Sequence, residues 1–164
     1  MSLLSSSLAK NKVSKLKKNG KVVVFTNGCF DLIHKGHTTY LKKARMLGDL
    51  LIVGLNSDES VLNLKGENRP INSVEKRSAN LLKLDYVDVV VIFEENTPRK
   101  LINEICPNIL VKGGDYTKEE VVGADQVLKN GGEVVIIPLV PGYSTTKMIN
   151  ALKEKGLTVQ DRTG

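Results

Sequence analysis

Short apolar stretches alternate with amphipathic stretches along most of the chain. Five apolar stretches are rich in β-branched residues and are bounded by turn residues, which is typical of buried strands. We expect these strands at residues 21–25, 50–55, 88–93, 109–112 and 133–138. Apolar residues at helical spacing between them predict helices at residues 38–47, 73–84, 97–105, 118–130 and 144–155.

This alternation predicts the fold class. Strands that alternate with helices favour an α/β protein with a Rossmann-like, doubly wound parallel sheet, here of five strands. A length of 164 residues fits a single domain. We expect a basic helical arm at residues 1–20, the domain at residues 21–156 and a tail at residues 157–164. In such a sheet, ligands bind beyond the carboxyl ends of the strands.

The positive charge of the chain is concentrated in the N-terminal arm. Residues 1–21 hold six lysines and no acidic residue, whereas the other 143 residues hold 18 basic and 18 acidic side chains. A nucleic-acid-binding protein usually spreads its positive charge over a folded face and adds aromatic side chains that stack on bases. The arm has no such aromatics, so we expect a solvated helix rather than a nucleic-acid site.

The cysteine content and the lengths of the apolar runs indicate the cellular compartment that we expect. Two cysteines, Cys29 and Cys106, make no disulfide framework and no CxxC pair, so we expect reduced thiols and a cytoplasmic protein. The longest apolar runs are five to seven residues, far from the roughly 20 that span a bilayer. No secretory signal is apparent at the N-terminus.

The loop after the first expected strand carries the most informative residues. Both histidines of the chain, His34 and His37, lie there with Gly36 between them, directly before a helix. The free N–H groups of a helix N-terminus favour an anion, and Gly36 allows the backbone to approach a ligand closely. Imidazole N–H groups also donate to phosphate oxygens, so this loop suits a nucleoside triphosphate.

Other interpretations of this loop stay open at this stage. The histidines are ordinary loop residues in one of them. In another they bind zinc with Cys29, although the spacing is unusual and a fourth ligand is not obvious. The loop contains neither the Walker A pattern GxxxxGK[ST] nor GxGxxG.

Residues 28–37 follow the pattern GxFDxxHxGH. This pattern resembles the HxGH signature of the cytidylyltransferase-like nucleotidyltransferases, and the longer form is far more specific than HxGH alone. The resemblance extends over most of residues 21–152 and implies the HxGH nucleotidyltransferase fold. It includes short motifs at residues 48–49, 56–58, 75–77, 86–88 and 142–147.

Two further segments, 65–71 and 111–116, narrow the branch of the family. They resemble the adenylyltransferase domain of ADP-heptose synthases, as does segment 94–98. Such synthases often fuse this domain to a sugar kinase; a kinase does not fit within 164 residues, so we expect the stand-alone form. The sister glycerol-3-phosphate cytidylyltransferases have two arginines that are absent here, where Asp85 and Leu139 stand.

The resemblance implies an enzyme that joins ATP and D-glycero-D-manno-heptose 1-phosphate to give ADP-heptose and pyrophosphate. Such a product serves lipopolysaccharide or surface-glycan synthesis. A cytidylyltransferase of the glycerol-3-phosphate type is the alternative. A nucleotide-binding module without turnover is a third interpretation, against which the intact His34 and His37 pair speaks.

The resemblance and the strand ends also imply site residues. The catalytic candidates are His34, His37, Lys112 and Arg77. The nucleotide-binding candidates are Thr26, Asn27, Gly28, Cys29, Phe30, His34, His37, Gly114, Asp115, Gly142, Ser144, Thr145 and Thr146. The candidates for the sugar phosphate are Asp31, Asn56, Lys65, Arg69 and Arg77.

Several of these candidates have a structural alternative. Asp31 can serve as a loop cap instead of orienting the sugar or helping to hold a metal ion. Lys112 can be a surface lysine, Arg77 can form a surface salt bridge, and Ser144 can cap the last helix.

The partners follow from the same resemblance. We expect ATP with Mg²⁺ and a sugar 1-phosphate as substrates, a homo-oligomer, and neither nucleic acid nor membrane as a partner. No protein ligand of the metal ion is assigned, and Asp115 is the one candidate.

Overall fold

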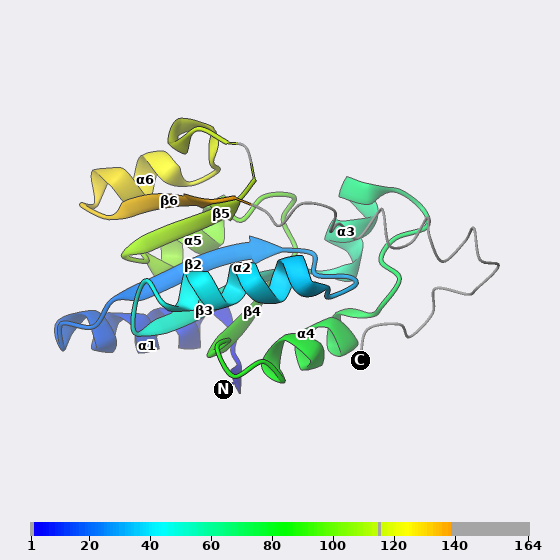
Figure 1. Ribbon diagram of the computed structural model, residues 1–164, viewed down its shortest axis with the longest axis horizontal. Helices are drawn as coiled ribbons and strands as arrows, with labels where there is room; N and C mark the ends of the chain where they lie inside the picture. Colours follow the sequence, from blue (N-terminus) through cyan, green and yellow to red (C-terminus); the bar gives the residue numbers. More distant parts are fainter. Residues whose placement is uncertain (1, 115, 139–164) are drawn as a thin grey trace.

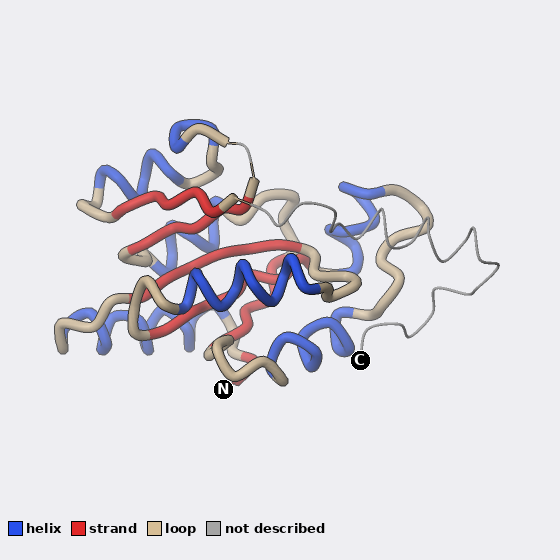
Figure 2. Tube along the Cα trace, viewed as in Figure 1, coloured by secondary structure: helices blue, strands red, loops and turns tan. Residues whose placement is uncertain are grey.

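A computed structural model shows six parallel strands in one sheet, with helices on both faces (Figures 1 and 2). It describes residues 2–114 and 116–138. The strands are β1 (Ser2–Leu3), β2 (Val23–Gly28), β3 (Leu50–Asn56), β4 (Val89–Phe93), β5 (Ile109–Gly113) and β6 (Glu133–Ile137), in the spatial order β1-β4-β3-β2-β5-β6. The doubly wound parallel α/β fold is confirmed.

The helices are α1 (Ser6–Lys18), α2 (Lys35–Arg45), α3 (Asp58–Lys65), α4 (Val74–Leu82), α5 (Arg99–Ile105) and α6 (Ala124–Lys129), with a 3₁₀ turn η1 (Lys118–Glu120). One buried cluster joins the sheet to α1, α5 and α6, and a second joins it to α2 and α4. The central strand β3 is buried along its whole length, because helices cover both of its faces.

The sixth strand comes from the N-terminal arm. Ser2 and Leu3 pair in parallel with Val89 and Val90 of β4 and so form the edge of the sheet. Helix α1 then packs its buried Ala9 and Val13 into the same cluster as α5. A two-residue strand is too short for a periodic pattern, which is why the sequence predicted five strands and a separate arm.

Helices α2, α3 and α6 depart most from the prediction. Helix α2 begins three residues earlier than predicted, because His34 caps it. Helix α3 was not predicted; Ser57 caps it and accepts from the Ser60 backbone at 3.1 Å. The predicted helix 118–130 is divided into η1 and α6, because Gly123 has a φ of +88° and a Cβ there would meet Ile102 at 2.8 Å.

The helix starts predicted at residues 73 and 97 have different outcomes. Ser73 caps α4, accepting from the Lys76 backbone at 3.3 Å. Thr97 does not cap α5, which begins at Arg99 without a side-chain cap bond. The predicted helix 144–155 and tail 157–164 lie outside the described residues.

Candidate active site

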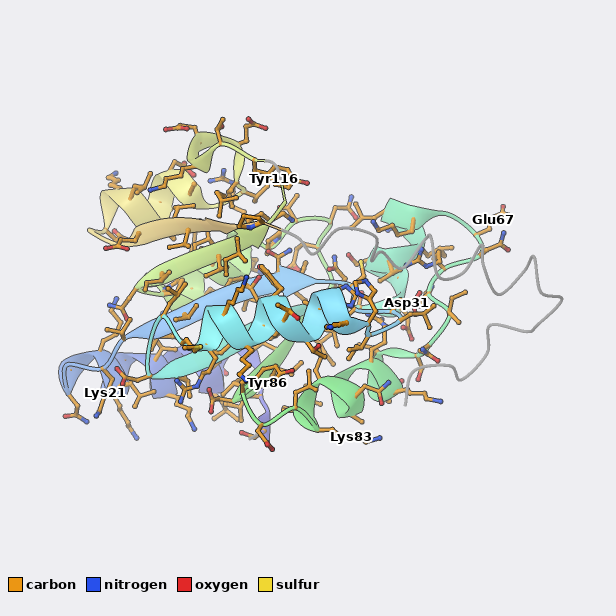
Figure 3. The ribbon with its side chains drawn as sticks, viewed as in Figure 1. Lys21, Asp31, Glu67, Lys83, Tyr86 and Tyr116 are labelled. Carbon is orange, nitrogen blue, oxygen red and sulfur yellow. The ribbon has the colours of Figure 1, made fainter. Side chains whose placement is uncertain are left out.

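A cavity of about 650 Å³ opens at the carboxyl ends of the central strands. Segments that follow β2, β3, β4 and β5 all contribute to it, together with the first turn of α2 and the end of α3. In Figure 3, Asp31 lies beyond the end of β2 and Tyr116 lies beyond the end of β5. The lining residues include Asn27, Gly28, Cys29, Phe30, Asp31, His34, Gly36, His37, Asn56, Lys65, Arg69, Lys112 and Tyr116.

The two histidines are locked together at the start of α2. His34 is the N-cap, and its Nδ1 accepts from the His37 backbone N–H at 3.3 Å. In return, the Nδ1 of His37 accepts from the His34 backbone N–H at 3.4 Å. The two rings stack with their centroids 3.8 Å apart. This reciprocal capping box fixes both imidazoles where the helix dipole favours an anion.

The protonation of the pair follows from this geometry. A nitrogen that accepts a hydrogen bond carries no proton, so each neutral imidazole carries its proton on Nε2 and acts there as a donor. Burial, and secondarily the nearby charge of His34, lower the pKa of His37 to about 4, although a hydrogen bond to the Leu32 backbone acts in the opposite direction. Burial also lowers the pKa of His34. Near pH 7, His37 is therefore a neutral donor.

Phe30 holds the loop against these histidines. Its ring lies edge-on to the His37 ring, with centroids 5.2 Å apart. A Cβ at Gly28 would come within 2.8 Å of the Phe30 ring, so the loop requires glycine there. Phe30 adopts the left-handed region at a φ of +47°, a conformation that non-glycine residues rarely adopt.

Asp31 is buried and both of its carboxylate oxygens accept hydrogen bonds from the protein. Oδ2 accepts from Arg69 Nε at 2.8 Å and from the Ile71 backbone at 2.7 Å. Oδ1 accepts from the Asn72 backbone at 2.8 Å. These bonds hold the segment before α4 against the loop after β2. They match the cap that was the alternative for Asp31, and its expected roles toward the sugar phosphate and a metal ion stay predictions.

Arg77 is placed differently from the expected phosphate ligand. Its side chain is fully buried and does not line the cavity. Nη1 donates to the carbonyl oxygens of Cys29 at 2.9 Å and Asn56 at 2.8 Å, and Nε donates to the Asn72 carbonyl at 3.0 Å. Nη2 forms an ion pair with Asp58 at 2.7 Å. Because these partners occupy the guanidinium, we correct its expected role from phosphate contact to support of the cavity floor.

Lysines supply the positive charge of the cavity. Lys112 lies on β5 near its carboxyl end and lines the cavity, and its Nζ lies 5.3 Å from the centroid of the Tyr116 ring. Burial, and secondarily the charge of Lys65, lower the pKa of Lys112. Lys65 lies at the end of α3 and Arg69 in the loop that follows, and both line the cavity. A polyanion would relieve the repulsion between the two lysines.

Two other candidates lie apart from the cavity lining. The Thr26 hydroxyl bonds to the Tyr40 hydroxyl and donates to the Val111 carbonyl, so it connects β2 to α2 and β5. Gly114 has a φ of +114° and its N–H donates to the Ile137 carbonyl.

Five predicted nucleotide-binding residues lie outside the described residues. They are Asp115, which follows β5, and Gly142, Ser144, Thr145 and Thr146 near the C-terminus.

Some lining residues were not assigned from the sequence. Asn96, Thr97 and Pro98 follow β4, although segment 94–98 had already signalled the family branch. Other such lining residues are Gly36, Leu64, Tyr116, Glu120, Val121 and Val122. Leu64 lies on α3, which the sequence pattern did not predict, and Glu120 lies on η1, which the sequence predicted as part of one longer helix.

No three His, Cys, Asp or Glu side chains among residues 2–114 and 116–138 are grouped so that they would hold a metal ion. The histidines, the lysines and the N-terminus of α2 make the cavity suited to an anion. No helix in those ranges is long and apolar enough to cross a membrane.

Comparison with protein families shows where this cavity belongs. The family model described as cytidylyltransferase-like matches residues 25–152. The chain belongs to the cytidylyltransferase-like family. The HxGH resemblance of residues 28–37 is thereby confirmed, and the histidine pair and the cavity lie at the strand ends of this family's domain.

Relatives with curated descriptions are bifunctional proteins named HldE. The chain is 55% identical to the HldE of Syntrophotalea carbinolica over 139 residues, which are 85% of this chain and 28% of that protein. It is 51% identical to the HldE of Actinobacillus pleuropneumoniae over 151 residues, 92% of this chain and 32% of that protein. The chain thus spans about a third of the length of these relatives.

A solved structure supports the fold. The lipopolysaccharide core biosynthesis protein from Thermoplasma volcanium superposes with a TM-score of 0.61 at 29% sequence identity. The superposition covers 74% of this chain and 98% of that one.

Proposed function

We propose that this chain transfers the adenylyl group of ATP to D-glycero-D-manno-heptose 1-phosphate, giving ADP-heptose and pyrophosphate. The observation that carries the proposal is the reciprocally capped His34 and His37 pair at the N-terminus of α2, facing a lysine-lined cavity. Membership of the cytidylyltransferase-like family supports a nucleotidyl transfer. Identity of about 50% to HldE proteins supports the heptose branch over the glycerol-3-phosphate branch.

The reaction needs no protein nucleophile. A phosphate oxygen of the sugar phosphate attacks the α-phosphorus of ATP, and the bond from that phosphorus to the oxygen bridging to the β-phosphate breaks. Pyrophosphate leaves with the electron pair of that bond. The attacking oxygen is already ionised near pH 7, so catalysis depends on positioning and on stabilising charge.

The chain's own residues have distinct tasks in this account. The Nε2–H groups of His34 and His37 donate to oxygens of the α- and β-phosphates, where charge builds up as the bond breaks. Lys112 neutralises the transferring phosphate, and Lys65 with Arg69 attracts the acceptor phosphate. Preorganised donors of this kind are each worth about 2.7–4 kcal/mol in the transition state.

Mg²⁺ enters this account as part of the MgATP substrate. The carboxylate of Asp31 is occupied by three donors, and the described residues offer no cluster of ligands. Asp115 stays our one candidate for a protein contact to the ion. We also propose a cytoplasmic homo-oligomer, as the resemblance implied.

Pyrophosphate release tests the proposal. ATP and CTP are each combined with heptose 1-phosphate, hexose 1-phosphates and glycerol 3-phosphate in the presence of Mg²⁺. Release with ATP and heptose 1-phosphate, lost in His34→Ala, supports the proposal. Release with CTP and glycerol 3-phosphate alone would assign the chain to the sister branch.

A further inference from the structure

The part of the cavity beyond β3 and β4 differs chemically from the part around the histidines. It is formed by Asn56 at the end of β3 and by Asn96 and Thr97 after β4. These side chains are amides and a hydroxyl, and the segment Phe93–Pro98 contributes no cation. The exposed carboxylates of Glu94 and Glu95 in this segment disfavour a phosphate there.

A relay of hydrogen bonds gives this region a fixed shape. Asn56 is 4% exposed, and its Nδ2 donates to the Ser60 hydroxyl at 3.0 Å. That hydroxyl in turn donates to the Glu95 carbonyl at 2.9 Å. The relay thus connects the end of β3, helix α3 and the segment that carries Asn96 and Thr97. With Nδ2 engaged, the amide of Asn56 offers Oδ1 as an acceptor.

A nucleobase suits this region poorly. The aromatic side chains that line the cavity are Phe30, which packs against His37, and Tyr116, which lies over Lys112. Both belong to the segments after β2 and β5, and the lining residues from the segments after β3 and β4 include no aromatic side chain for stacking. Neutral donors and acceptors around a polar opening instead match the hydroxyl groups of a sugar ring.

We propose that Asn56, Asn96 and Thr97 form the subsite that binds the hydroxyl groups of the acceptor sugar and so select a sugar 1-phosphate over a shorter alcohol phosphate. This rests on the proposed function and adds the residues that decide acceptor choice. Lys65 lies at the end of α3 and lines the same cavity. Ser60, which accepts from Asn56, lies on the same helix, so α3 supports both the sugar subsite and the binding of the sugar's phosphate.

The test uses Thr97→Val, which removes the hydroxyl at constant shape, and Asn96→Ala. Both side chains are exposed, so the fold is preserved. Asn103→Ala on α5 is the control, because Asn103 is exposed and lies outside this cavity. KM for ATP and KM for heptose 1-phosphate are measured separately for each variant by pyrophosphate release.

We expect each variant to raise KM for heptose 1-phosphate by about three- to tenfold, the effect of one or two neutral hydrogen bonds. KM for ATP and the control variant stay at the wild-type values. A rise in KM for ATP, or no change in either constant, would overturn the subsite. Wild-type protein without turnover on any sugar phosphate would instead refute the proposed function, and the subsite with it.

Discussion

The backbone N–H of His37 donates to Nδ1 of His34, and the backbone N–H of His34 donates to Nδ1 of His37. Each imidazole therefore does two things: it caps α2, and it presents Nε2 as its protonated nitrogen. A substitution that removes the ring removes both, so the two contributions must be separated by the choice of side chain.

His34→Asn separates them. Asparagine is a preferred N-cap residue and preserves the cap, but it provides no imidazole donor. We expect stability close to wild type and a loss of about 100- to 1,000-fold in kcat, the effect of one transition-state donor. His34→Ala loses the same activity and in addition about 1 kcal/mol of stability. Thermal unfolding and pyrophosphate release measured on both variants check this; full activity in His34→Asn would contradict it.

The lowered pKa of His37 predicts acid sensitivity of the fold. Its pKa is about 4 in the folded state and 6.5 in the unfolded chain, so the unfolded chain binds more protons between these values. Stability contributed by the neutral ring is therefore complete above about pH 6.5 and is lost as the pH falls toward 4. The loss amounts to about 3 kcal/mol.

His37→Gln provides the comparison, because glutamine at this position of a capping box also accepts from the N-cap backbone. Urea unfolding at pH 7, 6, 5 and 4 should show a shallower decline in the variant than in the wild type. Parallel pH profiles for the two proteins would show that His37 does not carry this acid sensitivity.

We predict that substitution of Arg77 lowers the stability of the fold, although its side chain does not line the cavity. Arg77→Met leaves the carbonyl oxygens of Cys29, Asn56 and Asn72 without their donor, and we expect a loss of about 3–5 kcal/mol. Asp58→Asn is the matched variant. Asparagine keeps an oxygen that accepts from Nη2, but the buried guanidinium loses its counter-charge, so we expect a measurable loss that is smaller than in Arg77→Met. Similar unfolding midpoints for both variants would refute this role of Arg77.

The packing of α1 on the sheet predicts that a substitution in the N-terminal arm changes the stability of the fold. Val13 is 1% exposed in the cluster with α5, whereas Leu8 on the same helix is 56% exposed. Val13→Asp places an unpaired charge in that cluster and should lower the unfolding midpoint sharply, because a buried charge without a partner is costly. Leu8→Asp should leave the midpoint within a few degrees. Equal midpoints would indicate that α1 does not pack on the sheet.

The sequence correctly predicted those elements whose pattern depends on residues close to one another along the chain. The central strands are continuous β-branched runs, and the spacing of His34, Gly36 and His37 directly before an amphipathic segment marked both the site and the family. Ser73 indicated the start of α4 for the same reason, because a cap acts on its own next few residues.

Long-range partners explain what the sequence did not predict. The sequence predicted Arg77 as a phosphate ligand or a surface salt bridge, because its carbonyl acceptors lie 5, 21 and 48 residues away along the chain. The division of the helix at Gly123 depends on contact with Ile102, and β1 depends on the free edge of β4. The roles of Asp115 and of residues 142–146 stay predictions.

The most direct test of the central claim is the identity of the product. Purified protein is incubated with MgATP, MgCTP and heptose 1-phosphate together, and the nucleotide sugar is identified by mass. We predict ADP-heptose with one pyrophosphate released per molecule formed, and none from His34→Asn above a few per cent of the wild-type rate. A CDP-sugar, or hydrolysis of ATP without a nucleotide sugar, would contradict the account.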